Sequence, residues 1–267
     1  MTRLSTQLAA NKLSNRKNLV TFITAGDPSV RMTLKLMHAL VSAGVDVIEL
    51  GVPFSDPMAD GPVIQRASER AVANGVGISD VLQLVSEFRS TNKSTPVVLM
   101  GYANPIEHMG QTAFIQQAVA SGVDGVLVVD YPPEESIEFS NKARDAGLNV
   151  IYLVAPTTAE ARMVSTARVA SGFIYYVSLK GVTGAGNLDV GAVKEQVAKL
   201  RLHTDLPINV GFGISDSASA RAVAEVADGV VIGSKLITLI ENAVNEGQDA
   251  EHIVREWTAD VRSVLDA

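Results

Sequence analysis

The stretch AGVDVIEL at residues 43–50 decides the fold, because its pattern recurs along the chain. A helix-like segment ends near a glycine, a Val-Asp or Asp-Gly pair comes with it, and an apolar run rich in β-branched residues follows, as in SGVDGVLVV at 121–129 and ADGVVI at 227–232. A glycine just past a helix stops that helix, and a continuous apolar run is typical of a strand buried on both faces. The pattern therefore predicts parallel strands that alternate with helices.

Similar apolar runs divide the chain into eight predicted strands. They lie at 19–24, 46–51, 96–101, 125–129, 149–154, 173–177, 207–211 and 228–232. Each gap between strands is long enough for a crossover helix, and no GxGxxG motif follows the first strand, which disfavours an open doubly wound sheet. We predict a single-domain (β/α)8 TIM barrel over residues 1–267. An extra N-terminal helix at 2–14 covers its bottom, and helices at 236–244 and 250–265 close it.

Composition narrows the classes of function. Apolar residues make up 47% of the chain, and the net charge of −7 argues against a nucleic-acid or anionic-membrane surface. Zero cysteines exclude disulfides, thiolate zinc sites and a cysteine nucleophile, and the four histidines lack metal-ligand spacing. We therefore expect no metal site. No stretch resembles a membrane span or a signal peptide, so we expect a soluble cytoplasmic protein.

Glycine-rich turns follow the last three predicted strands. They read LKGVTGAGN at 179–187, GFGISD at 211–216 and GSK at 233–235. In a barrel, the loops at the C-terminal ends of the strands form the active site, and amides at the helix N-termini after strands seven and eight bind phosphate. The turns predict a phosphate site, with tight-turn geometry and a serine N-cap as the alternative.

Two carboxylates are candidates for acid–base chemistry. Glu49 alternates with Val47 and Gly51 along the second strand, so it points either into the barrel mouth or among the helices. An unpaired carboxylate is costly in either place, and desolvation raises its pKa toward neutrality, which suits a group that gives and takes a proton. Asp60 follows in the next loop. It is either catalytic or the cap of a helix that starts at Pro62.

Other polar residues just past strand ends stay open. Asp27, Asp56 and Asp130 fit either catalysis or turns, and Lys180 and Lys235 fit either an imine-forming role or a solvated one. The residues alone thus indicate acid–base chemistry on a phosphorylated small molecule. They leave open an imine-forming aldolase, a sugar-phosphate isomerase, or a phosphoester-binding subunit that activates a partner.

The stretch ELGVPFSDPMADGP at 49–62 resembles the signature of the tryptophan synthase alpha chain family. Shorter stretches are similar to other motifs of that family in the same order, namely YANP at 102–105, GVTG at 181–184, GFGIS at 211–215 and GS at 233–234. The resemblance extends over residues 15–260.

The resemblance implies a (β/α)8 barrel that cleaves indole-3-glycerol phosphate to indole and glyceraldehyde 3-phosphate. It implies that Glu49 moves protons at indole C3 and at the glycerol hydroxyl, and that Asp60 accepts the indole N–H. The phosphate would be bound by the amides of Gly184, Gly213, Gly233 and Ser234. The indole pocket would be formed by Phe22, Tyr102, Leu127, Tyr175 and Phe212. Thr183 would close over the site near Asp60 and exclude water.

The resemblance also implies a partner. Chains of this family bind a pyridoxal-phosphate-dependent beta chain in an α2β2 heterotetramer and pass indole to it, while they carry no cofactor themselves. The contact would involve the loop around Asp56 and the region near Asn104 and Pro105.

Overall fold

The computed structural model describes residues 2–178, 189–211 and 213–267. Eight parallel strands form a closed barrel, in which each strand pairs with the next and β8 pairs with β1. The strands are β1 Asn18–Thr24, β2 Val47–Gly51, β3 Val97–Gly101, β4 Gly125–Val128, β5 Asn149–Val154, β6 Ile174–Val177, β7 Ile208–Gly211 and β8 Gly229–Ile232. Each boundary lies within one residue of its predicted position, and the predicted (β/α)8 barrel is confirmed.

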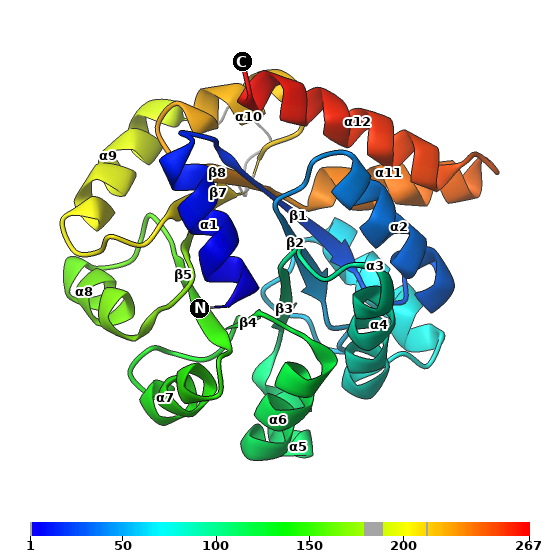
Figure 1. Cartoon of the computed structure of the whole chain (residues 1–267), viewed down its shortest axis with the longest axis horizontal. Helices are drawn as coiled ribbons and strands as arrows, with labels where there is room; N and C mark the ends of the chain where they lie inside the picture. Colours follow the sequence, from blue (N-terminus) through cyan, green and yellow to red (C-terminus); the bar gives the residue numbers. More distant parts are fainter. Residues whose placement is uncertain (1, 179–188, 212) are drawn as a thin grey trace.

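Helices surround the barrel (Figure 1). Those of the described residues are α1 Arg3–Leu13, α2 Val30–Ser42, α3 Pro62–Ala73, α4 Ile78–Thr91, α5 Ala103–Met109, α6 Gln111–Ser121, α7 Ile137–Asp145, α8 Glu160–Val169, α9 Val190–Arg201, α10 Ser217–Ala224, α11 Ser234–Asn245 and α12 Ala250–Leu265. The two predicted closing helices correspond to α11 and α12. Across the described ranges, none of these helices has the length and apolar character needed to cross a membrane.

The core has two parts. The larger lies between the strands and the surrounding helices, and the smaller fills the barrel. The smaller cluster brings inward side chains of the strands, such as Val47, Val98 and Val231, together with Leu4 and Leu8 of α1. Helix α1 lies across the end of the barrel that faces the viewer in Figure 1. It therefore closes the N-terminal end of the barrel, as predicted.

The aspartate of the repeated sequence pattern has a structural role. Three such aspartates each precede a strand and accept a hydrogen bond from an amide at the start of the preceding strand. The pairs are Asp46 with Leu19 N at 2.8 Å, Asp124 with Val97 N at 2.9 Å, and Asp228 with Ile208 N at 2.8 Å. The pattern recurs because each aspartate links one βα unit to the strand that follows it.

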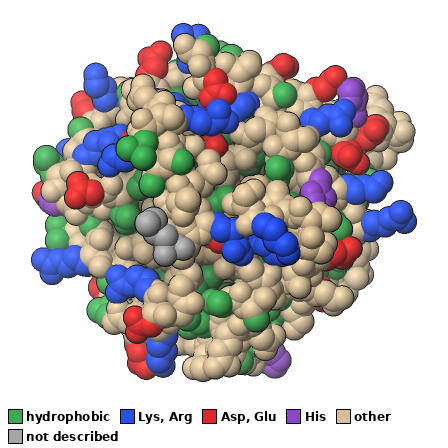
Figure 2. Space-filling model, viewed as in Figure 1, with side chains coloured by type: hydrophobic (Ala, Val, Ile, Leu, Met, Phe, Trp, Pro, Cys, Tyr) green, Lys and Arg blue, Asp and Glu red, His purple; other side chains and the backbone are tan. Residues whose placement is uncertain are grey.

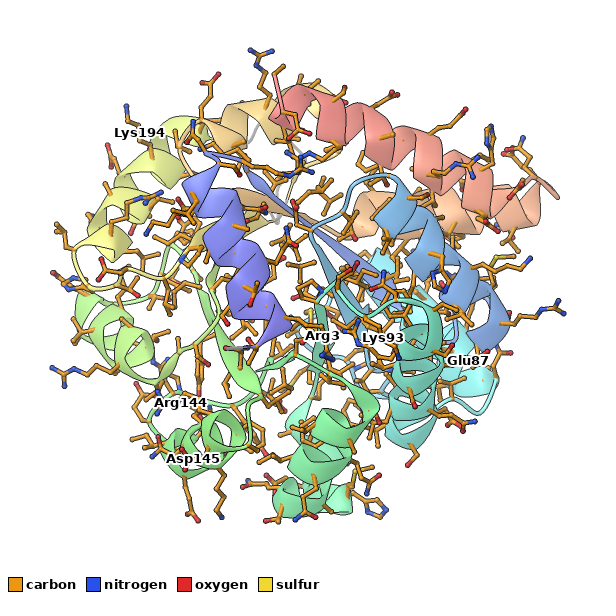
Figure 3. The ribbon with its side chains drawn as sticks, in the orientation of Figure 1. Arg3, Glu87, Lys93, Arg144, Asp145 and Lys194 are labelled. Carbon is orange, nitrogen blue, oxygen red and sulfur yellow. The ribbon has the colours of Figure 1, made fainter. Side chains whose placement is uncertain are left out.

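Arginines neutralise these aspartates. Arg89 Nη2 lies 2.7 Å from Asp124 Oδ2, and Arg3 of α1 lies 3.1 Å from the other oxygen of that carboxylate. Figure 3 labels Arg3 at this end of the barrel. Arg262 pairs with Asp46 in the same way at 3.0 Å. Charges of both signs are otherwise interspersed over the face shown in Figure 2.

Candidate active site

A cavity of about 500 Å³ opens at the C-terminal ends of the strands, opposite α1. Its wall combines two carboxylates, two aromatic rings and the start of α11. The predicted site residues on this wall are Phe22, Glu49, Asp60, Tyr175, Gly213, Gly233 and Ser234. Seven of the predicted residues, which are widely separated in the sequence, therefore meet at one cavity.

Glu49 points into the barrel. It lies opposite Phe22 of β1 and Val98 of β3 in the strand register, and Val98 belongs to the cluster that fills the barrel. The side chain is 1% exposed, and neither carboxylate oxygen has a hydrogen-bond partner among the described residues. Burial, assisted by the negative charge of Asp60, raises the pKa of Glu49 to about 8. A large share of this carboxyl is therefore protonated near neutral pH and able to donate its proton.

Asp60 faces the same cavity from the loop after β2. The hydroxyl of Tyr102 donates a hydrogen bond of 3.0 Å to Asp60 Oδ2, and Gln65 Nε2 donates one of 2.7 Å to the Asp60 carbonyl. Burial raises the pKa of Asp60, and the bond from Tyr102 opposes that rise. The helix-cap alternative for Asp60 is wrong, because Gly61 is the N-cap residue of α3 and no side chain caps this helix.

The start of α11 offers backbone donors to the cavity. Gly233 is the N-cap residue of this helix and Ser234 is its first residue, so their amides belong to the helix end that carries unpaired N–H groups and a positive partial charge. Gly213 lies nearby on the cavity wall with φ of 78°, a left-handed conformation that favours glycine. This arrangement suits an anion such as a phosphate.

Glycines leave room for the two aromatic rings. A Cβ atom on Gly211 would lie 2.4 Å from Tyr175 Oη, and one on Gly51 would lie 2.6 Å from Phe22 Cζ. The rings therefore occupy space that side chains at these strand ends would fill. Burial raises the pKa of the Tyr175 hydroxyl, which stays neutral beside the two carboxyl groups.

Some predicted residues lie elsewhere. Tyr102 borders a smaller hollow beside Asp60, and Leu127 packs inside the barrel with Val98 rather than on the described wall of the cavity. Thr183, Gly184 and Phe212 lie outside the described residues.

The sequence reasoning missed much of the apolar wall. It is formed by Ile64, Met100, Val129, Leu153, Ala155, Val177, Ile214 and Val231. Several of these residues lie at or just past the C-terminal ends of strands. Applying the alternation of Val47, Glu49 and Gly51 to the other strands would have selected those residues as one of two possible faces.

The remaining polar candidates have structural partners or lie off the wall. Asp27 pairs with Arg70 at 2.7 Å, and Asp130 accepts a hydrogen bond of 2.8 Å from the first amide of α5. Asp56 accepts one of 2.6 Å from Ser55. Lys235 is absent from the described wall of the cavity, and Lys180 lies outside the described residues. Within the described ranges, no group of histidine and acidic side chains could hold a metal ion.

Comparison with known proteins agrees with this geometry. The sequence matches the family described as "Tryptophan synthase alpha chain" over residues 8–265. It is 58% identical to the tryptophan synthase alpha chain of Cupriavidus pinatubonensis over 267 residues, with all of both chains covered. It is also 58% identical to that of Thiobacillus denitrificans, covering 100% of this chain and 97% of the relative.

A solved structure agrees as well. The crystal structure of tryptophan synthase subunit alpha from Legionella pneumophila superposes with a TM-score of 0.93 at 44% identity. The match covers 100% of this chain and 99% of that one. The chain belongs to the tryptophan synthase alpha chain family.

Proposed function

We propose that Glu49 and Asp60 carry out the lyase reaction of this family, the cleavage of indole-3-glycerol phosphate to indole and glyceraldehyde 3-phosphate. One observation carries the proposal. Glu49 is a buried carboxyl group whose two oxygens have no partner among the described residues, and it faces the same cavity as a second carboxylate. Such an unpaired buried group is costly, so its presence favours a role in chemistry.

The cavity suggests how the substrate lies. The phosphate binds at the start of α11, next to Gly213, Gly233 and Ser234, because these amides are available to an anion. The indole ring lies deeper, between Phe22 and Tyr175. A volume of about 500 Å³ suits a small molecule of this size. In this orientation the reacting carbon atoms lie between Glu49 and Asp60.

The proton balance then uses one carboxyl group twice. Protonated Glu49 gives its proton to C3 of the indole, which leaves a positive charge on the ring nitrogen. The Asp60 carboxylate accepts the hydrogen bond of that N–H and stabilises the charge. Glu49, now ionised, takes the proton of the glycerol hydroxyl next to the ring. The carbon–carbon bond breaks, its electron pair neutralises the ring, and the hydroxyl carbon becomes the aldehyde.

The environments of the two groups suit these roles. Burial raises the pKa of Glu49 to about 8, so it begins the reaction protonated in much of the protein at neutral pH. Tyr102 opposes the effect of burial on Asp60 and favours its ionised form. The surroundings thus act differently on the two carboxyl groups, because burial at Glu49 has no hydrogen bond from the described residues to oppose it, whereas the bond from Tyr102 opposes it at Asp60.

Family membership implies a beta-chain partner. In the proposed assembly, an α2β2 heterotetramer, the beta chain holds pyridoxal phosphate and receives the indole. The loop around Asp56 supports this part, because its apolar Met58 side chain is 78% exposed and the next residue, Ala59, lines the cavity. The whole chain, residues 1–267, acts as one domain in this proposal.

The test is indole formation from indole-3-glycerol phosphate by the purified chain, with and without a cognate beta chain. We expect indole in both cases and faster release with the partner. A folded chain that releases no indole under either condition would contradict the proposal.

A further inference from the structure

We propose that Arg70 is a positioning residue for this reaction. Through Glu241 and Asp27 it fixes the helix that follows Asp60 against the helix that binds phosphate. The inference rests on the proposed roles of Asp60 and of the start of α11.

Helices α3 and α11 lie side by side, and each begins at the cavity. Helix α3 begins at Pro62, just after Asp60, and α11 begins at Ser234. Arg70 and Glu241 lie about two turns along their helices, and Arg70 Nη1 is 2.6 Å from Glu241 Oε1. An ion pair therefore joins the two helices at similar depths below the cavity.

A second arginine strengthens this link. Arg66, about one turn before Arg70 on α3, places Nη2 at 3.1 Å from Glu241 Oε2 and Nε at 3.3 Å from Oε1. The Glu241 carboxylate of α11 thus forms ion pairs with two arginines of α3. Contacts at two points along α3 restrict both the sliding of one helix along the other and the separation of the two helices.

Arg70 also reaches a third segment. Its Nε and Nη2 atoms bind the two oxygens of Asp27 at 2.7 and 2.9 Å. Asp27 is 2% exposed and lies in the loop after β1, the strand that carries Phe22. A partly buried, two-point pair of this kind holds its geometry better than a fully exposed pair. Arg70 consequently joins three βα units that each contribute to the cavity.

The loop that carries Asp60 moves with α3. Ser68 Oγ accepts a hydrogen bond from the amide of Phe54 and donates one to its carbonyl, both of 2.9 Å. Gln65 donates a hydrogen bond to the Asp60 carbonyl. Any shift of α3 relative to α11 therefore changes the separation between Asp60 and the phosphate-binding amides. Misplacement of a reacting group by about 1 Å reduces the rate by as much as 100-fold.

The decisive variant is Glu241→Ala, which removes the link between the helices and leaves the bond from Arg70 to Asp27. We expect single-turnover cleavage to slow about ten-fold, while KM changes less than about three-fold, because the phosphate amides remain on α11. Glu241→Gln retains one acceptor oxygen, so its cleavage rate should lie between those of Glu241→Ala and the unmodified chain. Arg70→Lys keeps the charge without the fork and should also slow cleavage.

The matched control is Glu134→Ala. Glu134 also accepts hydrogen bonds of 3.2 Å from two nitrogens of one arginine, Arg162. Both side chains are about half exposed and lie off the described cavity wall. We expect its cleavage rate to be unchanged. Thermal unfolding of each variant identifies any that fails to fold, in which case Glu241→Gln replaces Glu241→Ala.

The Asp60→Asn background separates positioning from general loosening. If Glu241 acts by placing Asp60, Glu241→Ala slows the Asp60→Asn chain less than about two-fold. Two results would overturn this inference and leave the proposed function intact. One is the same ten-fold loss of rate in both backgrounds. The other is an unchanged rate in Glu241→Ala when Asp60→Asn is impaired. A fully active Asp60→Asn chain, or no indole from the unmodified chain, would contradict the proposed function as well.

Discussion

The hydroxyl of Tyr102 donates a hydrogen bond of 3.0 Å to the carboxylate of Asp60. It also accepts one of 3.0 Å from the amide of Ala59, so its own orientation is fixed. Tyr102 therefore holds the Asp60 carboxylate in place and favours its ionised form, against the burial that raises the pKa of Asp60.

Replacement of Tyr102 by phenylalanine tests this relationship. Without the hydroxyl, the pKa of Asp60 rises further, and the reaction needs Asp60 ionised. We therefore expect the acidic limb of the pH–rate profile to move to higher pH and the rate at neutral pH to fall about ten-fold. The measurement is single-turnover indole formation across pH 5 to 9. Tyr131→Phe is the control, because Tyr131 also donates to a carboxylate, that of Glu107, off the described cavity wall. An unmoved acidic limb in Tyr102→Phe would count against this role.

Glu49→Gln should abolish indole release and stabilise the protein in alkaline solution. Loss of a general acid–base group costs up to about 10⁴-fold in rate. In the folded chain the pKa of Glu49 is about 8, raised from an ordinary value of 4.5. Between these values the folded state binds more protons than the unfolded state, so stability falls as pH rises through this window. Glutamine removes that loss.

Thermal unfolding at pH 5 and pH 8.5 measures the effect. The Tm of Glu49→Gln should exceed that of the unmodified chain by more at pH 8.5 than at pH 5. A difference in Tm that is the same at both pH values would show that Glu49 ionises as easily in the folded chain as in the unfolded one.

Ser234→Asp separates phosphate binding from folding. A negative charge in the first turn of α11 stabilises the helix by about 0.3 to 1 kcal/mol, yet it repels the substrate phosphate. We expect KM to rise about 100-fold with no loss of Tm. Ser234→Ala is the control and should stay within about three-fold of the original KM, because the backbone amide does the binding. An unchanged KM in Ser234→Asp would place the phosphate elsewhere.

Asp124→Ala should destabilise the barrel. It leaves buried Arg89 without its carboxylate and the amide of Val97 without an acceptor, which together cost about 3 to 5 kcal/mol. Urea unfolding measures the loss, with Asp124→Asn as a milder variant if the alanine chain fails to fold. The exposed pair of Glu134 and Arg162 serves as reference, since removing an ion pair that lies in solvent changes the stability little. Similar losses for the two changes would argue against the structural role of Asp124.

The sequence predicts most of what depends on local pattern. Strands with continuous apolar runs, and the alternation that left two orientations for Glu49, follow from side-chain periodicity alone. The prediction of the strands succeeds because each strand is buried on both faces, and a continuous apolar run rich in β-branched residues is typical of such strands.

Contacts between distant residues escaped that reasoning. Asp60 was equally compatible with a helix cap, and only the closed barrel brings Tyr102 to it. Nothing in the local pattern around Asp124 shows that its carboxylate reaches the amide of Val97. The pairing of Arg70 with both Asp27 and Glu241 likewise depends on barrel closure, which places the first, second and eighth units side by side.

The position of α1 also determines from which end of the barrel a small molecule can reach the cavity. Leu4 and Leu8 pack beneath the inward side chains of the strands, so the filled interior of the barrel is closed at that end. Among the described residues the cavity lies at the opposite end, so we expect substrate and products to enter and leave there. In the proposed orientation the phosphate lies nearer that opening and the indole ring lies deeper. A protein bound over this opening would therefore control both the entry of substrate and the release of products.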